Sequence, residues 1–345
     1  MNLKLKLLWT ITSSPGTLTD LKMLKEAEGF DINIITADHK RIDYGAFTVA
    51  DKNYYIPNYD DDNYLDSIMD ICNKEKITTI IPQYGGELMP LSQNIKKFEG
   101  MGISVLVTED TKGLETANNK IKLYEYFNGM DFIPEYRKVA DIEELEGAIY
   151  ALGYPDNPVC IKPAEGEGGS GFWIVTDENI DVFNEIDRER INWDTLKSQL
   201  VKLDTFPEVI VTEYLSGSEY SVDCVAYDGK SYVCIPRERL ETAMGVAIVT
   251  RLKKDQRLID ISEYIISKLN LSYNINVQFK YSKYGKPKLL EINPRVSGSL
   301  VANLGAGVNM LEASLRLAYK MPIKDINIKW GASMIKYWDQ LFMGS

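Results

Sequence analysis

The sequence predicts an α/β domain with a parallel, doubly wound sheet, followed by an α+β domain. Strand and helix patterns alternate over the first 110 residues, which is typical of a parallel sheet. Beyond this point strand patterns follow one another in pairs, which is typical of hairpins. The length of 345 residues suggests two or three domains, at roughly one domain per 100–200 residues.

The elements of the first segment are predicted from local patterns. Short runs rich in apolar and β-branched residues predict strands at 3–11, 31–38, 77–82 and 103–108. Helical spacing predicts helices at 17–29, 62–76 and 87–102. The first of these helices closes on Gly29, and the last has Pro90 in or near its first turn. No strand–helix junction in this segment carries a glycine triplet for phosphate binding.

The remaining elements follow from the same signals. Helices are expected at 112–128, at 255–270 and near 308–320, and the acidic stretch 177–200 is expected to be mostly helical. Single strands are expected at 158–162, 172–176 and 208–215. Two hairpins are expected, one at 219–236 that turns at Asp228–Gly229 and one at 275–293.

Composition argues against several classes of protein. With 45% apolar and 26% charged residues the chain is typical of a soluble globular protein, and no apolar run reaches the roughly 18 residues of a membrane span. A net charge of −11 without a Lys/Arg cluster argues against nucleic-acid binding. His39 is the single histidine, which excludes a His-ligated zinc site and leaves any His-based triad only that residue.

The cysteines and the N-terminus predict a compartment. Cys72, Cys160, Cys224 and Cys234 show no C-x-x-C spacing, so we expect reduced, mostly buried thiols. The N-terminal apolar run is too short for a signal peptide and is read as the first strand. We therefore expect a cytoplasmic protein whose chemistry depends on carboxylates, lysines, arginines and a hard metal ion.

Residues 161–175, "IKPAEGEGGSGFWIV", contain a G-x-G-x-x-G pattern formed by Gly166, Gly168 and Gly171. A dinucleotide-binding fold requires a helix after the glycines, whereas "FWIV" predicts a strand. A protein kinase requires an H-R-D sequence after the loop, and His39 precedes it. The two alternatives that remain are a flexible surface hairpin and a loop whose backbone approaches a ligand closely.

The neighbouring motifs decide between these alternatives. Lys162-Pro163 with the glycine loop, Glu213-Tyr214-Leu215 with Glu219, Gln278, and "EINPR" at 291–295 form an ordered set. This set resembles the ATP-grasp superfamily, and in particular the ATP-binding half-domains of the carbamoyl-phosphate synthetase large subunit, over about residues 112–320. The resemblance implies an α/β domain at 1–110, an ATP-grasp first subdomain or lid at 111–210, and a C-terminal subdomain with the metal site at 211–345.

The resemblance implies a set of ATP-binding residues. The phosphates would be bound by Lys120, Lys162, Gly168, Gly169 and Ser170, and the loop would fold over them and exclude water. Asn119 stands where the family often has Asp. The adenine would contact Glu213, Tyr214 and Leu215, and Glu219 would accept hydrogen bonds from the ribose hydroxyls. We expect Glu165 and Glu167 to point away from the phosphates, or Glu165 to approach a cation or an amine substrate.

The hairpin at 275–293 predicts a metal site. A turn about Tyr284–Gly285 places Gln278 opposite Glu291, with Asn293 on the same face. Three oxygen-bearing side chains suit Mg²⁺ or Mn²⁺, and the resemblance places the metal at the same three residues. Arg295 is expected to hold the carboxylate or bicarbonate that is phosphorylated. Further candidate substrate residues are Arg237, Arg239 and Arg251.

The reaction implied by the resemblance starts with attack of a carboxylate on the γ-phosphate of ATP. We expect an ATP- and Mg²⁺-dependent ligase that couples a small carboxylate to an amine through an acyl phosphate. One alternative is a carbamoyl-phosphate-synthetase-like enzyme acting on bicarbonate or carbamate, and another is a nucleotide-binding protein without catalysis. A homodimer is expected by analogy only, and the sequence does not name the acid or the amine.

Overall fold

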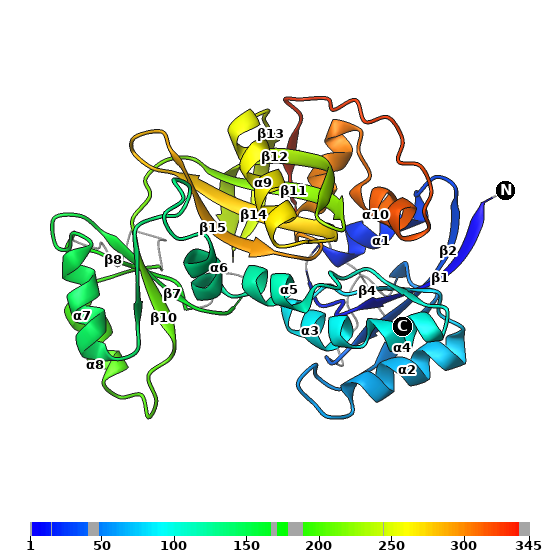
Figure 1. Cartoon of the computed structure of the whole chain (residues 1–345), viewed down its shortest axis with the longest axis horizontal. Coiled ribbons are helices and arrows are strands. Elements are labelled where there is room, and N and C mark those ends of the chain that lie inside the picture. The colour runs from blue at the N-terminus through cyan, green and yellow to red at the C-terminus, as the bar shows by residue number, and fades with distance from the viewer. Residues whose placement is uncertain are drawn as a thin grey trace. The chain divides into compact units, whose positions relative to one another are not determined.

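The computed structural model describes residues 2–14, 16–40, 48–166, 171–178, 189–243 and 245–337 (Figure 1). The chain forms two compact units, each built from separate stretches of sequence. The first unit comprises Met1–Ala117, Tyr220–Gln278 and Ile292–Ser345, and the second comprises Asn118–Glu219 and Phe279–Glu291. The three-part division expected from the sequence stays a prediction.

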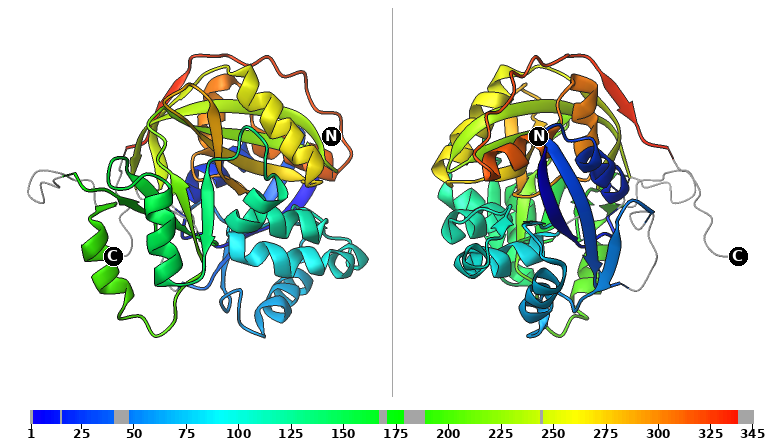
Figure 2. Two further views of the ribbon diagram at one scale, coloured as in Figure 1. Left: turned by 60° about the vertical axis from the view of Figure 1, so that its left-hand side comes forward. Right: turned by 90° about the vertical axis from the view of Figure 1, so that its right-hand side faces the viewer.

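The N-terminal sheet of the first unit is parallel throughout, with strand order β3-β2-β1-β4-β5. Its strands are β1 (Leu3–Thr10), β2 (Phe30–Asp38), β3 (Lys52–Tyr55), β4 (Thr79–Ile81) and β5 (Ser104–Val105). The neighbouring strands β1 and β2 are drawn in blue in the right-hand view of Figure 2. This confirms the predicted parallel α/β domain. The prediction missed β3, which is short and mostly exposed, so that it carries no buried apolar run.

Helices cover both faces of this sheet, so β1 is buried on both sides. Leu7 and Trp9 pack in one apolar cluster with α1 (Thr17–Lys25), and Leu8 packs in another with α2 (Tyr64–Glu75) and α3 (Gly85–Gln93). A strand covered on both faces must be apolar at consecutive positions, as "LLW" at 7–9 is.

The helix predicted at 87–102 is two helices, α3 and α4 (Ile95–Gly100). Pro90 lies in the second turn of α3 rather than in its first. Because proline cannot donate a backbone hydrogen bond and crowds the preceding turn, a helix that contains one is weakened. α3 ends at Gln93, and the Asn94 side chain donates to the Pro90 carbonyl at 2.9 Å.

The start of α3 contains a buried carboxyl group, that of Glu87. It accepts hydrogen bonds from Thr10 Oγ1 at 2.6 Å, from Tyr64 Oη at 2.8 Å and from the backbone amides of Gln83 and Tyr84. Burial raises its pKa to about 7, although these hydrogen bonds act in the opposite direction. Glu87 thereby ties β1, α2 and α3 together.

The second sheet of the α+β region has the order β15-β14-β11-β12-β13-β16. Its strands are β11 (Glu219–Tyr227), β12 (Lys230–Ala243), β13 (Val246–Leu252), β14 (Tyr273–Tyr281), β15 (Pro287–Asn293) and β16 (Ser333–Ile335). The predicted turn at Asp228–Gly229 is confirmed, with φ of 50° and 71°, as the favoured two-residue hairpin turn requires. Helices α9 (Gln256–Lys268) and α10 (Met310–Ala318) confirm the two helices predicted after residue 250.

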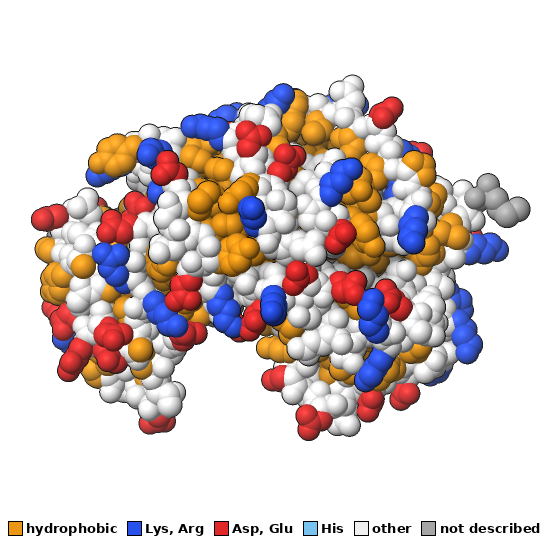
Figure 3. Space-filling model, viewed as in Figure 1, with side chains coloured by type: hydrophobic (Ala, Val, Ile, Leu, Met, Phe, Trp, Pro, Cys, Tyr) orange, Lys and Arg blue, Asp and Glu red, His pale blue; other side chains and the backbone are white. Residues whose placement is uncertain are grey.

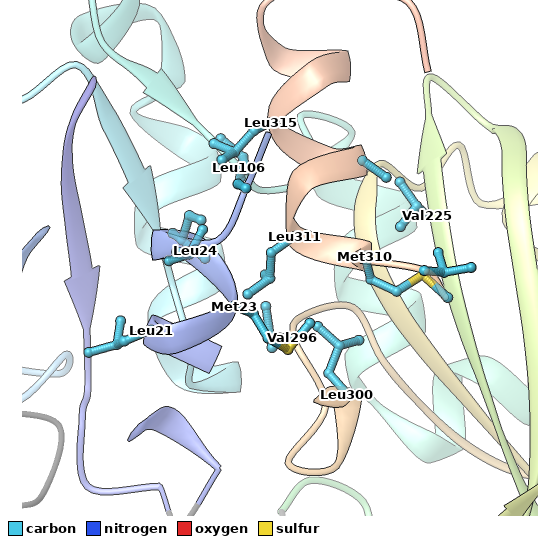
Figure 4. Close-up of a cluster of buried hydrophobic side chains, with 14 of the residues drawn as sticks. Leu21, Met23, Leu24, Leu106, Val225, Val296, Leu300, Met310, Leu311 and Leu315 are labelled. Atoms are coloured by element: carbon cyan, nitrogen blue, oxygen red, sulfur yellow. The ribbon is translucent and has the colours of Figure 1, made fainter. Parts of the chain in front are cut away.

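An apolar core joins the N-terminal sheet to the second sheet within the first unit. Figure 4 shows Met23 of α1 near Leu311 of α10, and Leu21 and Leu24 of α1 and Leu315 of α10 belong to the same cluster. These five side chains are at most 1% exposed. Their cluster also includes Val225 and Val233, from strands β11 and β12. At about 25 cal/mol per Å² of apolar surface buried, such side chains contribute most of the stabilisation of this unit.

The second unit is built on a mixed sheet with strand order β6-β10-β7-β8-β9. Its elements are α6 (Lys120–Tyr126), β6 (Tyr136–Val139), α7 (Ile142–Ala151), β7 (Val159–Pro163), β8 (Trp173–Val175), β9 (Arg190–Ile191), α8 (Trp193–Leu200) and β10 (Val209–Glu213). The tip of the β14–β15 hairpin belongs to this unit, because Tyr124 Oη donates to the carbonyls of Leu289 and Leu290 and the Leu289 amide donates to Phe132.

Two predicted helices differ from the structure. The helix expected at 112–128 is divided into α5 (Thr111–Asn118) and α6, because Asn119 is extended and caps α6. Within the acidic stretch 177–200 the described residues contain strand β9 and helix α8, and residues 179–188, on which most of the predicted helix falls, lie outside the described residues. The sequence prediction missed β6 and α7.

In the described ranges no helix is long and apolar enough to cross a membrane. On the face shown in Figure 3, Lys and Arg side chains are interspersed with Asp and Glu side chains, in keeping with the absence of a basic cluster in the sequence.

Candidate functional site

Lys162 lies near the end of β7, a strand that pairs with β10 on one side and β8 on the other. Its Nζ lies 5.8 Å from the centroid of the Phe172 ring. Burial lowers the pKa of Lys162 below its ordinary value. The positive charge of Lys120 adds to this effect, while the carboxylates of Glu291 and Glu219 oppose it. The charges of Lys120, Glu291 and Glu219 therefore all act on Lys162.

Lys120 is the first residue of α6, and its backbone is fixed at both sides. The Asn119 side chain accepts hydrogen bonds from the amides of Ile121 and Lys122, and the Lys120 amide donates to the Ala164 carbonyl at 2.9 Å. This places the Lys120 Nζ 3.1 Å from Glu291 Oε2.

Two carboxylates supply the negative charge beside these lysines. Glu291 lies in β15, and Glu219 begins β11, where its Oε2 is 3.8 Å from the Nζ of Lys280. Lys120, Lys162, Glu219 and Glu291, which we call the charged cluster, all belong to the second unit. Sequence reasoning named all four, and the structure brings them within electrostatic reach.

The predicted adenine-contact residues lie at the end of β10. Glu213 Oε1 accepts a hydrogen bond from the Glu135 amide at 2.9 Å, and the Glu213 amide donates to the Glu135 carbonyl. The Tyr214 ring has two cations near it, with Lys280 at 5.8 Å and Arg190 at 5.9 Å from its centroid. Leu215 is buried. The end of β10 is thus held by hydrogen bonds to the Glu135 backbone, and an aromatic ring lies beside it.

Part of the glycine loop lies outside the described residues, including Gly168, Gly169, Ser170 and Glu167. At its flanks, Gly166 and Gly171 have φ of 137° and 72°, which only glycine adopts readily. Lys120 Nζ donates to the Gly166 carbonyl at 3.3 Å. Glu165 is exposed and accepts a hydrogen bond from Asn119 Nδ2 at 2.9 Å.

Two predicted metal ligands lie in the first unit, and each has its oxygen beside a guanidinium group. Gln278 Oε1 accepts from Arg239 Nη1 at 2.7 Å, and Asn293 Oδ1 accepts from Arg295 Nη2 at 3.1 Å. In the second unit the oxygen of Glu291 has the Lys120 ammonium as its neighbour.

The other two candidate substrate arginines differ in setting. Arg237 is 2% exposed and forms an ion pair with Asp223, with Nε 2.8 Å from Oδ2. Arg251 lies on β13 and is exposed. Arg237 is therefore a buried partner of a carboxylate, a setting that the sequence reasoning did not foresee.

The turn of the β14–β15 hairpin differs from the expected register. The Ser282 amide donates to the Lys286 carbonyl at 2.9 Å, whereas a turn about Tyr284–Gly285 would place Ser282 opposite Pro287. Ser282 and Lys286 thus pair across residues 283–285, which shifts the register by one residue from the prediction, so that this register does not place Gln278 directly opposite Glu291. The assignment of Gln278, Glu291 and Asn293 to a metal stays a prediction.

Sequence reasoning overlooked two buried polar residues of the second sheet, Asp223 and Asn276, which are 0% and 2% exposed. A signal was present, since Asp223 stands in the interior of the apolar strand "EYSVDCVAY" and a charge there requires partners. No group of three or more His, Cys, Asp or Glu side chains arranged for a metal occurs among the described residues. A site made largely of amide oxygens has no such group.

Comparisons with known protein families identify the fold. A model described as "ATP-grasp in the biosynthetic pathway with Ter operon" matches residues 205–336, and a model of the PylC-like N-terminal domain matches residues 11–106. Residues 205–336 thus resemble the ATP-grasp family. This confirms the resemblance predicted from the ordered motifs, and the ATP-grasp match covers the strands that carry Glu213, Gln278 and Glu291.

Curated relatives of the chain include carbamoyl phosphate synthase large chains. That of Clostridium acetobutylicum is 24% identical over 295 residues, which are 81% of this chain and 25% of the relative. The arginine-specific large chain of Geobacillus stearothermophilus is 24% identical over 328 residues, which are 87% of this chain and 27% of the relative. The chain thus spans about a quarter of the length of these relatives.

Solved structures share the fold over nearly the whole chain. An N5-carboxyaminoimidazole ribonucleotide synthetase with ADP is 16% identical, with a TM-score of 0.71 over 95% of this chain and 80% of that one. The biotin carboxylase domain of a Hydrogenobacter thermophilus 2-oxoglutarate carboxylase, with MgADP and bicarbonate, is 18% identical, with a TM-score of 0.69 over 96% and 74%. An L-amino acid ligase from Bacillus licheniformis is 14% identical, with a TM-score of 0.64 over 93% and 75%.

Proposed function

We propose that this ATP-grasp chain is an ATP- and Mg²⁺-dependent ligase that phosphorylates a small carboxylate and couples it to an amine. The charged cluster carries the proposal. Two lysines from different elements, Lys120 and Lys162, lie close enough for their charges to interact. Two nearby carboxylates partly offset the positive charge of these lysines. Like charges repel, so such a pair is expected where a polyanion such as a triphosphate binds.

The chain's own residues would bind and orient the nucleotide. Lys162 and Lys120 donate charge-assisted hydrogen bonds to phosphate oxygens, each worth about 1.5–3 kcal/mol. Because burial lowers the pKa of Lys162, its surroundings are poorly solvated, and an anion placed there is attracted more strongly than in water. Glu219 accepts from the ribose hydroxyls, and the end of β10 at Glu213, Tyr214 and Leu215 contacts the base.

The residues present fit a hard divalent ion. Gln278, Glu291 and Asn293 offer two amide oxygens and a carboxylate, and each of these oxygens already has a cationic neighbour in its own unit. Oxygen donors of this kind are those that Mg²⁺ and Mn²⁺ prefer. When bound, the ion neutralises charge on the phosphates during transfer. We propose these three residues as its ligands.

The reaction proceeds in two balanced steps. A carboxylate oxygen of the acid forms a bond to the γ-phosphorus while the bond from that phosphorus to the ADP oxygen breaks, so that an acyl phosphate and ADP result. The amine nitrogen then forms a bond to the acyl carbon, phosphate leaves, and the nitrogen loses a proton. Arg295 holds the acid as a fixed cation, and Arg239 and Arg251 are further candidates for this role.

Bicarbonate is a second candidate for the acid. Two observations favour bicarbonate. Two curated relatives are carbamoyl phosphate synthase large chains, and one structural neighbour was solved with bicarbonate. An amino-acid ligase is also a structural neighbour. An assay with a panel of acids and amines therefore identifies the substrates.

A screen of ADP formation distinguishes the two candidates. The chain is incubated with MgATP and pairs drawn from a panel of amino acids, with bicarbonate as a separate arm, and products are identified by mass spectrometry. ADP formation that requires an organic acid and an amine supports the ligase. ADP formation with bicarbonate alone supports the second candidate. ATP binding without turnover over the whole panel would contradict both.

Glu291→Gln tests the metal assignment. The variant keeps an oxygen donor but loses the negative charge, so we expect ADP formation to be lost while the melting temperature stays within about 2 °C of the original. The matched control is Glu208→Gln, because Glu208 also pairs with a lysine of the second unit, at 3.0 Å from Lys138, and is more exposed. Full turnover in Glu291→Gln would contradict the assignment.

A further inference from the structure

A buried carboxylate on β11 organises one polar network of the first unit. Asp223 is 0% exposed and accepts hydrogen bonds from Arg237 Nε at 2.8 Å, Ser297 Oγ at 2.8 Å, Asn276 Nδ2 at 2.7 Å and Asn303 Nδ2 at 2.9 Å. An unpaired buried charge would cost several kcal/mol. Here every donor comes from a different part of the chain, so Asp223 fixes their positions relative to one another.

The network leaves Asp223 ionised. Burial alone would raise the pKa of Asp223, but the charge of Arg237 and the hydrogen bonds of Arg237, Asn303 and Ser297 outweigh it and lower the pKa. A carboxylate in this state is an acceptor only, so each amide beside it must turn an NH₂ group toward it. The orientation of the Asn276 amide is thereby determined.

Asn276 transmits this orientation to Gln278. Since Asn276 Nδ2 donates to Asp223, its Oδ1 is available and accepts from Gln278 Nε2 at 3.2 Å. With its NH₂ group held there, Gln278 turns Oε1 the other way, where it accepts from Arg239 Nη1 at 2.7 Å. The three residues form a directional relay in which the charge of Asp223, through Asn276, and the donor-only guanidinium of Arg239 favour the same orientation of the Gln278 amide.

We infer that Asp223 and Asn276 are positioning residues that hold the Gln278 oxygen ready for a divalent cation. This inference rests on the proposed function, which makes Gln278 a metal ligand. An amide can present either oxygen or NH₂, and only the oxygen binds a metal ion. Groups that orient a metal ligand in this way commonly affect metal affinity by 10- to 100-fold, to order of magnitude.

The chain offers a matched pair of variants to test the relay. Asn276→Ala and Asn303→Ala each remove a buried asparagine that donates to Asp223, at 2.7 and 2.9 Å, but only Asn276 also contacts Gln278. The probe is Mn²⁺, titrated against the whole chain in the presence of ADP and followed by electron paramagnetic resonance. We expect Asn276→Ala to weaken Mn²⁺ binding about tenfold or more and Asn303→Ala to leave it within about twofold.

A double-mutant cycle separates positioning from a general loss of structure. Gln278→Glu replaces the amide with a carboxylate, which presents an oxygen at either end, so its orientation no longer matters. In this background we expect Asn276→Ala to weaken Mn²⁺ binding by less than about threefold. A tenfold loss in both backgrounds would mean that Asn276 acts through the fold, and would overturn the inference. If Asn276→Ala does not fold, Asn276→Ser is used in both backgrounds.

The outcomes distinguish this inference from the proposed function. Mn²⁺ binding by the unchanged chain with equal affinities in Asn276→Ala and Asn303→Ala would overturn the relay and leave the proposed ligase standing. No Mn²⁺ binding by the unchanged chain with ADP would overturn the metal site and the relay together. A selective loss in Asn276→Ala, suppressed by Gln278→Glu, supports both.

Discussion

The Asn119 side chain both accepts and donates hydrogen bonds, which a carboxylate in its place could not do. Its Oδ1 caps α6 by accepting from the Ile121 and Lys122 amides, and its Nδ2 donates to Glu165. Aspartate, which the family often has here, would cap the helix equally well but would face Glu165 with a second negative charge. The hydrogen bond from Asn119 to Glu165 therefore favours an amide over a carboxylate at position 119.

At the residue scale, Glu87 predicts a pH dependence of stability. Its pKa in the folded chain is about 7, above the ordinary value of 4.5. The folded state therefore binds the proton more tightly, and the stabilisation from this proton is complete below about pH 4.5 and is lost as the pH rises through about 7.

Glu87→Gln should remove this dependence, because the amide retains an acceptor for Thr10 and does not titrate. Urea unfolding of both proteins at several pH values gives the difference in their free energies of unfolding. We expect the original chain to lose stability relative to the variant between about pH 4.5 and 7. A difference that stays constant with pH would show that Glu87 keeps an ordinary pKa.

At the element scale, two helical glycines have opposite surroundings. A Cβ on Gly113 of α5 would lie 1.8 Å from the carbonyl oxygen of Leu269, which is backbone at the end of α9 and does not give way easily. A Cβ on Gly147 of α7 would meet no atom within 4 Å. Gly113 therefore allows α5 and α9 to approach closely, whereas Gly147 has no such role.

The two alanine variants should change stability in opposite directions. Gly113→Ala forces α5 away from α9, and we expect a loss of about 1–3 kcal/mol in the free energy of unfolding. Gly147→Ala reduces the backbone freedom of the unfolded chain, and we expect a gain of about 0.5–1 kcal/mol in the free energy of unfolding. Denaturant unfolding monitored by circular dichroism measures both. Equal effects in the two variants would contradict the close approach of α5 and α9.

At the scale of the whole molecule, nucleotide binding should stabilise the fold. A ligand that binds only the folded chain raises its stability by about 2.7 kcal/mol at a concentration 100 times Kd. We expect MgADP to raise the melting temperature, and Lys162→Met to abolish that rise, because the proposed nucleotide site then lacks one of its two lysines. Lys4→Met, at an exposed position of β1, is the matched control and should keep it. An equal rise in Lys162→Met would remove Lys162 from the nucleotide site.

Much of the fold was predictable because its signals are local. The strands of the N-terminal sheet and the turn at Asp228–Gly229 depend on residue types a few positions apart, and the structure has them as expected. The division of helix 112–128 at Asn119 was missed, although asparagine is a common helix cap, because the helical spacing continues through it. The placement of Pro90 in the second turn of α3 was missed, because α3 begins at Gly85, earlier than the pattern suggested.

The sequence by itself determined the resemblance to the ATP-grasp superfamily, through ordered motifs, and the residues that carry charge, such as Lys162 and Glu291. Only the tertiary structure decided how these residues are paired. The contact between Lys120 and Glu291 requires a hairpin tip that packs against α6, and the relay from Asp223 to Gln278 requires β14 to lie beside β11. Side-chain alternation shows which residues of a strand face inward, but the order of strands in a sheet arises from contacts between distant segments, which no local pattern encodes.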